Sequence, residues 1–129
     1  MRLLLDTHTL VWWLSENPKL SRVAAAAIAD PDNDVFVSAA SGWEMATKVR
    51  RRRWPEAERL IVQMDNVLEA NRIGVVPILM RDAIRAGYFK GDHQDPFDRM
   101  IAAVVLGQED LTLVSIDSVF TELGVRTLW

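Results

Sequence analysis

Hydrophobic residues along the chain form short continuous runs that alternate with longer segments of helical spacing. The short runs predict buried strands over residues 2–5, 35–37, 73–76, 111–116 and 125–128. Apolar residues spaced three and four apart predict helices over residues 7–14, 22–29, 41–52, 55–69, 78–88 and 96–106. The predicted order therefore alternates strands with helices along the chain.

Capping and turn residues mark the ends of several of these elements. Ser41 is followed three residues later by Glu44, which matches a capping box at a helix start. Pro55 and Pro96 suit the first position of two later helices, where a missing N–H costs nothing. We therefore expect helices to begin near these three positions.

The strand sequences predict the fold class. Because each strand is mostly apolar, both faces of the sheet should be covered by helices. We predict a three-layer α/β/α domain around a central, mostly parallel sheet of about five strands. A chain of 129 residues with no repeat or linker fits one such domain over residues 1–129.

Charge and composition exclude several classes of protein. The formal net charge is -3, so affinity for nucleic acid would need a local basic patch. The absence of Cys excludes a disulfide framework and Cys-ligated zinc. No apolar run reaches the roughly 20 residues of a membrane span, and Asp6 interrupts the N-terminal leucines, which read as a strand. We expect a cytoplasmic protein with no membrane partner.

Four acidic residues map to the same edge of the predicted sheet. Asp6 and Asp117 directly follow two strands, while Glu44 and Asp98 fall in the first turns of two helices that follow strands or loops. Because parallel strands end at one edge, the four carboxylates should converge there. Converging carboxylates repel one another and raise their own pKa values unless a cation lies among them.

Each acid also has a simpler interpretation, because acids at helix N-termini cap free N–H groups and complement the helix dipole. The joint placement of all four favours a site. Oxygen ligands without Cys favour Mg²⁺ or Mn²⁺ over zinc. Such an ion activates water for phosphodiester hydrolysis, so a metal-dependent nuclease is one expectation.

Four segments of the chain resemble the PIN-domain ribonucleases, and specifically the VapC type of toxin. They are residues 3–14, 38–48, 95–102 and 113–120, in the family's order. The resemblance implies a PIN-like fold and an Mg²⁺- or Mn²⁺-dependent endoribonuclease, the toxin of a toxin–antitoxin pair. It implies that Asp6, Glu44, Asp98 and Asp117 bind the metal, supported by Ser115 and Thr7. It further implies a homodimer and a cognate antitoxin that blocks the site.

A basic cluster is the candidate for binding RNA. It consists of Lys48, Arg50, Arg51, Arg52 and Arg53, which follow Glu44 on or just after its helix. The alternative is a solvated helix end whose cations complement the dipole. Arg99 is a further candidate for phosphate contact, although an Arg beside an acid more often forms a local ion pair.

Two other functions compete with the nuclease. The segment Asp6-Thr7-His8-Thr9 partly matches the DxDxT motif of haloacid-dehalogenase-like phosphatases, but His8 stands where the second Asp should be. A non-catalytic α/β interaction module would instead use the helices that carry Trp12 and Trp13, since tryptophans are more often core or interface residues than base-stacking ones.

Overall fold

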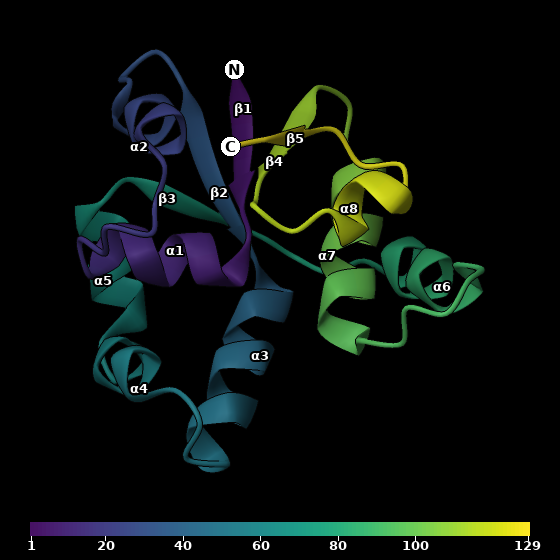
Figure 1. The fold of residues 1–129 in the computed structure, drawn as a ribbon, viewed down its shortest axis with the longest axis horizontal. Coiled ribbons are helices and arrows are strands. Elements are labelled where there is room, and N and C mark those ends of the chain that lie inside the picture. The colour runs from purple at the N-terminus through teal and green to yellow at the C-terminus, as the bar shows by residue number, and fades with distance from the viewer.

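A computed structural model describes all 129 residues and confirms the three-layer α/β/α fold (Figure 1). The five strands lie in the order β3-β2-β1-β4-β5, and every pairing between them is parallel. Their bounds are β1 Arg2–Leu5, β2 Asp34–Ser38, β3 Ile73–Val76, β4 Leu111–Val114 and β5 Thr127–Leu128. The first strand of the chain is therefore the middle strand of the sheet.

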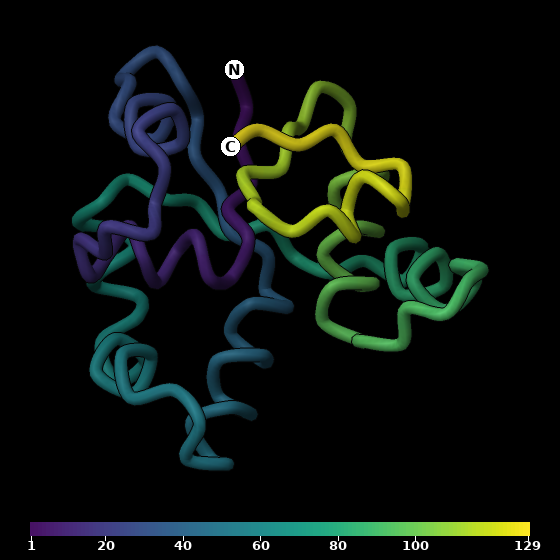
Figure 2. The backbone as a smooth tube through the Cα atoms, viewed as in Figure 1, coloured from purple at the N-terminus to yellow at the C-terminus, as the bar shows by residue number.

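Eight helices surround this sheet. They are α1 Thr7–Leu14, α2 Arg22–Ala29, α3 Ala39–Arg50, α4 Pro55–Ile61, α5 Met64–Ala70, α6 Met80–Tyr88, α7 Pro96–Leu106 and α8 Val119–Glu122. After β2 the chain runs through α3, α4 and α5 before returning to β3, and it then crosses to α6 and α7 on the other side (Figure 2). None of these helices has the length and apolar character that crossing a membrane requires.

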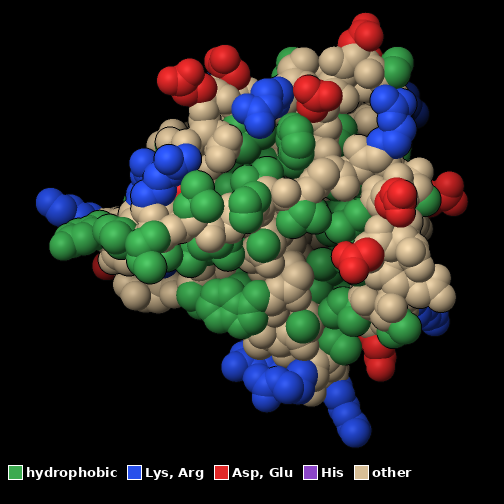
Figure 3. Space-filling model, turned by 180° about the vertical axis from the view of Figure 1, so that it is seen from behind, with side chains coloured by type: hydrophobic (Ala, Val, Ile, Leu, Met, Phe, Trp, Pro, Cys, Tyr) green, Lys and Arg blue, Asp and Glu red, His purple; other side chains and the backbone are tan.

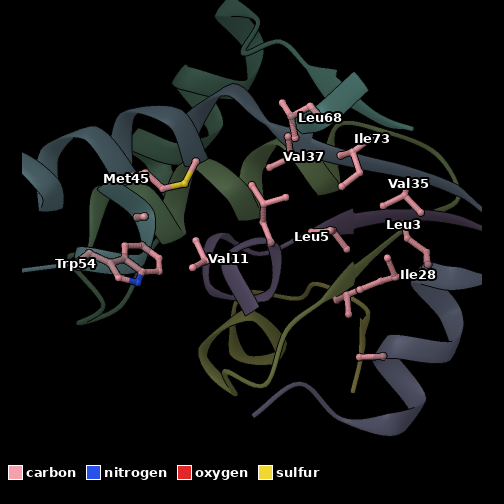
Figure 4. Close-up of a cluster of buried hydrophobic side chains, with 14 residues drawn as sticks. Leu3, Leu5, Val11, Ile28, Val35, Val37, Met45, Trp54, Leu68 and Ile73 are labelled. Atoms are coloured by element: carbon pink, nitrogen blue, oxygen red, sulfur yellow. The ribbon is translucent and has the colours of Figure 1, made fainter. Parts of the chain in front are cut away.

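Side chains of β1 alternate between two hydrophobic clusters. Leu3 and Leu5 pack in one cluster with residues of α1 to α5, as Figure 4 shows for its labelled members. Leu4 packs in the other cluster, which is built mainly from α7 and α8. All three leucines are fully buried, and each contributes about 2 kcal/mol of hydrophobic stabilisation. Burial on both faces explains the continuous apolar run in the sequence.

The start of α3 corrects one expectation. The helix begins at Ala39 rather than at residue 41, because Ser38 has an extended backbone and its hydroxyl accepts from Ala40 N at 3.1 Å. The capping box predicted for Ser41 and Glu44 is therefore wrong. Glu44 lies in the second turn of α3, not in the first, and its side chain is buried.

Other boundaries also differ from the predictions. The helix predicted over residues 55–69 is two helices, α4 and α5, because the chain turns at Val62 and Gln63. This turn lets α4 pack on α3 while α5 packs on β3. Helix α8 was not predicted, and β4 ends at Val114, two residues earlier than expected.

An apolar stripe lies on the outer face of α6. Met80, Ile84 and Tyr88 follow one another at four-residue spacing and are exposed by 78%, 53% and 81%. In the view of Figure 3, Lys and Arg side chains gather instead at the lower end of the molecule, where α3 ends.

Candidate active site

The ends of β1 and β4 place Asp6 beside Ser115. Leu5 and Val114 are partners in the parallel register, so the residues that follow them meet at one edge. Ser115 Oγ donates to Asp6 Oδ2 at 2.8 Å, and Thr7 N donates to Asp6 Oδ1 at 2.7 Å. Asp6 is also the N-cap of α1, so the capping interpretation of this acid holds alongside the site.

Asp6 is held in an environment that disfavours its charge. Its residue is only 7% exposed, and burial raises the pKa of its carboxyl from 3.8 to about 7. Within this net shift, the hydrogen bond from Ser115 acts to lower the pKa, whereas the charges of Glu44 and Asp98 add to the effect of burial. Three of the four predicted acids therefore interact electrostatically at this edge of the sheet.

Glu44 projects from α3 and is buried, with a residue exposure of 3%. Its Oε1 accepts from Lys48 Nζ at 2.6 Å, one helical turn later. Its Oε2 is buried with no hydrogen-bond partner. A buried carboxylate oxygen without a donor is unfavourable, and a cation would satisfy it.

Asp98 lies in the first turn of α7. The cap of this helix is Asp95, whose Oδ1 accepts from Phe97 N and Asp98 N at 2.9 and 3.2 Å. The carboxylate of Asp98 is free of that role and meets His93 Nε2 at 2.9 Å. Burial raises the pKa of Asp98 to about 6, the charges of Asp95 and Glu44 raise it as well, and the bond to His93 lowers it.

His93 is a residue that the sequence analysis left out of the site. It lies in the loop before α7, five positions before Asp98. The sequence did offer one indication of this contact, because His93 lies shortly before the predicted start of the helix that carries Asp98.

Asp117 lies at the rim of the site. It follows β4 and is exposed, and its Oδ1 accepts from Val119 N at 3.0 Å. Its own N–H donates to Ser115 Oγ at 3.1 Å, so the hydroxyl that holds Asp6 also holds the turn at Asp117. The connection between Asp117 and Asp6 runs through this hydroxyl.

Thr7, predicted to support the acids, and Arg99, predicted as a candidate for phosphate contact, make other contacts than expected. The Thr7 hydroxyl pairs with Ser41 Oγ at 2.9 Å in the interior, so it is the backbone N–H of Thr7 that contacts Asp6. The Arg99 guanidinium donates to four backbone carbonyls, at distances of 2.8 to 3.3 Å. These belong to Ala86, Gly87, Phe89 and His93. Arg99 therefore holds the loop that carries His93, and we do not retain it as a phosphate ligand or an ion-pair partner.

The acids do not form a ready-made metal site. No three Asp, Glu or His side chains are placed so that they could hold one ion together. Each of the three carboxylates instead has a partner of its own, which is Ser115 for Asp6, Lys48 for Glu44 and His93 for the half-buried Asp98. The oxygen donors, the raised pKa values and the unpartnered Glu44 Oε2 nevertheless fit a hard divalent cation.

A groove of about 910 Å³ opens beside these acids. Trp43 and Lys48, which flank Glu44 on α3, and Asp95 and Phe97, which precede Asp98, contribute to its lining. The remaining aromatic and basic lining residues are His8, Trp12, Trp54, Lys19, Arg50, Arg51 and Arg53. Four of the five residues in the predicted basic cluster thus line the groove, and Arg52 does not.

The aromatic rings of the groove are arranged in two groups. His8 stacks on Trp54 with ring centroids 4.5 Å apart, and Trp12 lies 5.8 Å from His8. In the second group, the Trp43 and Phe97 rings meet edge to face with centroids 4.4 Å apart. Trp54 is buried, whereas the Trp43 residue remains 51% exposed.

Comparisons with known proteins agree with this architecture. A profile of the PIN domain matches residues 3–125. The chain is 31% identical over 105 residues to Ribonuclease VapC22 of Mycobacterium tuberculosis, covering 80% of this chain and 78% of that protein.

Two solved structures share the fold at low identity. VapBC2 from Rickettsia felis, bound to a DNA fragment from the promoter, matches with a TM-score of 0.72 and 18% identity, over 99% of this chain and 98% of that chain. VapBC-1 from nontypeable Haemophilus influenzae matches with a TM-score of 0.69 and 16% identity, over 99% and 97%.

Proposed function

Because the chain belongs to the PIN domain family, and within it to the VapC group, we propose that it is a metal-dependent endoribonuclease. The observation that carries this proposal is the buried Oε2 of Glu44, which has no hydrogen-bond partner and belongs to a carboxylate whose charge acts on both Asp6 and Asp98. Capping explains one oxygen of Asp6 but does not explain why Glu44 is buried inside a helix. A role in cation binding would account for all three acids, although in this structure they are not placed to hold one ion together.

The chain's own residues position the acids. Asp6, Glu44 and Asp98 would hold Mg²⁺ or Mn²⁺, with Asp117 as a further acid at the rim. When bound, such an ion supplies Lewis-acid catalysis for hydrolysis of a phosphodiester. Ser115 fixes the orientation of Asp6, and His93 does the same for Asp98. Lys48 compensates the charge of Glu44.

We also propose a cognate antitoxin and a homodimer as protein partners, with RNA as the substrate. The VapBC assemblies among the similar structures support the antitoxin, and the name of the curated relative supports RNA. The protein would then be the toxin of the pair. Its cytoplasmic location stays a prediction.

The first experiment measures cleavage of RNA by the purified protein in chelator and after addition of Mg²⁺ or Mn²⁺. We expect activity to vanish in chelator and to return with either ion. Glu44→Gln and Asp98→Asn should each lower the rate by about 100-fold or more, because each removes a charged ligand with little change of shape. Asp32→Asn, an exposed acid at the opposite edge of the sheet, is the matched control.

Two outcomes would contradict this function. Full cleavage in excess chelator would exclude the metal mechanism. Variants that keep wild-type activity, together with a melting temperature that does not respond to Mg²⁺, would favour the non-catalytic interaction module. The phosphatase interpretation has lost its support, since His8 stacks on Trp54 in place of the second acid that such an enzyme needs.

A further inference from the structure

Trp43 occupies an unusual position between the two helices that carry buried acids. It directly precedes Glu44 on α3, and its ring meets Phe97, which directly precedes Asp98 on α7. Successive helical residues diverge by about 100°, so Trp43 turns outward while Glu44 turns inward. The Trp43 residue is 51% exposed and lines the groove. It therefore presents a large aromatic surface beside the candidate active site.

The groove is also positively charged, although the chain as a whole is not. Its lining contains five Lys or Arg side chains against two carboxylates, Glu56 and Asp95, whereas the formal net charge of the chain is -3. Concentrated cations attract a polyanion and hold its phosphates. Aromatic rings together with cations are the combination that binds single-stranded nucleic acid.

The size of the groove suits part of a flexible strand. Its volume of about 910 Å³ lies at the upper end of the range of about 300–1,000 Å³ for small-molecule sites. Two pairs of aromatic rings line this space, Trp43 with Phe97 and His8 with Trp54. None of the four candidate acids lines the groove. Lys48 links the two, because it pairs with Glu44 and lies over the Trp54 ring at 5.2 Å.

We propose that this groove is a subsite for an unpaired nucleotide of the RNA, with its base stacked on Trp43 and the neighbouring phosphates held by the basic side chains. The proposal rests on the proposed ribonuclease function and assigns Trp43 and the groove a role in it. A base inside a duplex has both faces covered by its neighbours, so only an unpaired base can stack on the indole. The nucleotide that Trp43 holds must therefore be unpaired.

The test measures binding by fluorescence anisotropy in chelator, with a short fluorescein-labelled single-stranded RNA of mixed sequence and its duplex as probes. We expect Trp43→Ala to weaken single-strand binding by about tenfold, since stacking on one aromatic side chain contributes that much. Trp43→Phe should retain most of the affinity. Tyr88→Ala removes an exposed aromatic ring from α6, outside the groove, and should bind like the wild type.

A second arm locates the stacked base. A set of RNAs is made, each with a single abasic site at a different position. At one position, loss of the base should weaken binding to the wild type about as much as Trp43→Ala weakens binding to the intact RNA. At that position the abasic RNA should bind the wild type and Trp43→Ala equally, because both have lost the same contact. Circular dichroism melts of both Trp43 variants check that they fold.

The outcomes separate this proposal from the proposed function. If the wild type cleaves RNA but Trp43→Ala binds the single strand as tightly as the wild type does, the subsite is overturned and the nuclease stands. Equal affinity of the wild type for duplex and single strand would also overturn it. If Trp43→Ala impairs binding of a protein partner and leaves RNA binding unchanged, the groove is a protein interface. A wild type that neither binds nor cleaves any RNA would defeat the proposed function itself.

Discussion

The raised pKa of Asp6 predicts how the stability of the metal-free protein depends on pH. Burial raises this pKa from 3.8 to about 7, so between these values the folded state binds a proton that the unfolded state has released. The free energy of unfolding must therefore fall as pH rises through this window. For Asp6 alone the full change is about 4 kcal/mol, of which about 2.5 kcal/mol falls between pH 5 and pH 8.

Asp6→Asn removes the titrating group and keeps its shape. The amide oxygen can still accept from Thr7 N, and the amide nitrogen can donate to Ser115 Oγ. The variant should therefore lose less stability than the wild type between pH 5 and pH 8. At pH 8 it should be the more stable protein in chelator, despite losing the charge at the cap of α1.

Urea denaturation followed by circular dichroism, in chelator at a series of pH values, measures this difference. Asp32→Asn should follow the wild-type curve, since that acid is exposed at the other edge of the sheet. Saturating Mg²⁺ should restore wild-type stability above pH 7, because a cation that binds the carboxylate stabilises the folded state. Parallel pH curves for the wild type and Asp6→Asn would refute the reasoning, because they would show that Asp6 is not held in a charge-disfavouring environment.

Three further predictions follow from individual contacts. Lys48→Met should lower the melting temperature in chelator and increase the gain in melting temperature from Mg²⁺, because the buried carboxylate of Glu44 loses its cationic partner; an unchanged Mg²⁺ response would contradict this. Arg53→Gln should reduce the slope of log affinity for single-stranded RNA against log salt concentration by about 0.7. Arg52→Gln, which lies outside the groove, should keep the wild-type slope. A wild-type slope for both variants would assign both arginines to a solvated surface. Arg99→Ala should cost about 2–4 kcal/mol in urea denaturation through its lost bonds to carbonyls, and a neutral result would contradict the role given to it.

Much of the fold could be predicted because burial on both faces leaves a simple pattern. The central strand β1 is a continuous apolar run, and the acid that follows it could be placed at the sheet edge from topology alone. Helix boundaries were harder to predict where two nearby residues could each serve as the N-cap. Ser38 and Ser41 are both good caps by residue type, and only the backbone angles of the folded chain show that Ser38 takes the role.

The partners of the acids could not be predicted in the same way. The pairing of Lys48 with Glu44 is local and follows from four-residue spacing on a helix. The contact between His93 and Asp98 depends on the course of the loop before α7, which Arg99 fixes through bonds to backbone carbonyls. Carbonyl acceptors are present at every residue, so an arginine that binds them leaves no pattern in a sequence.

Capping and metal binding need not be alternatives for an acid at a sheet edge. Asp6 caps α1 through Oδ1, and Asp117 bonds the N–H of Val119, so in both cases backbone donors help to orient the carboxylate. Their bonds to backbone N–H groups would account for the positions of Asp6 and Asp117 even if neither acid bound a metal. Glu44 is different, because it lies inside α3, caps nothing and keeps one buried oxygen unpaired. That oxygen costs stability and has no structural use, so Glu44 discriminates best between a folding role and a cation site.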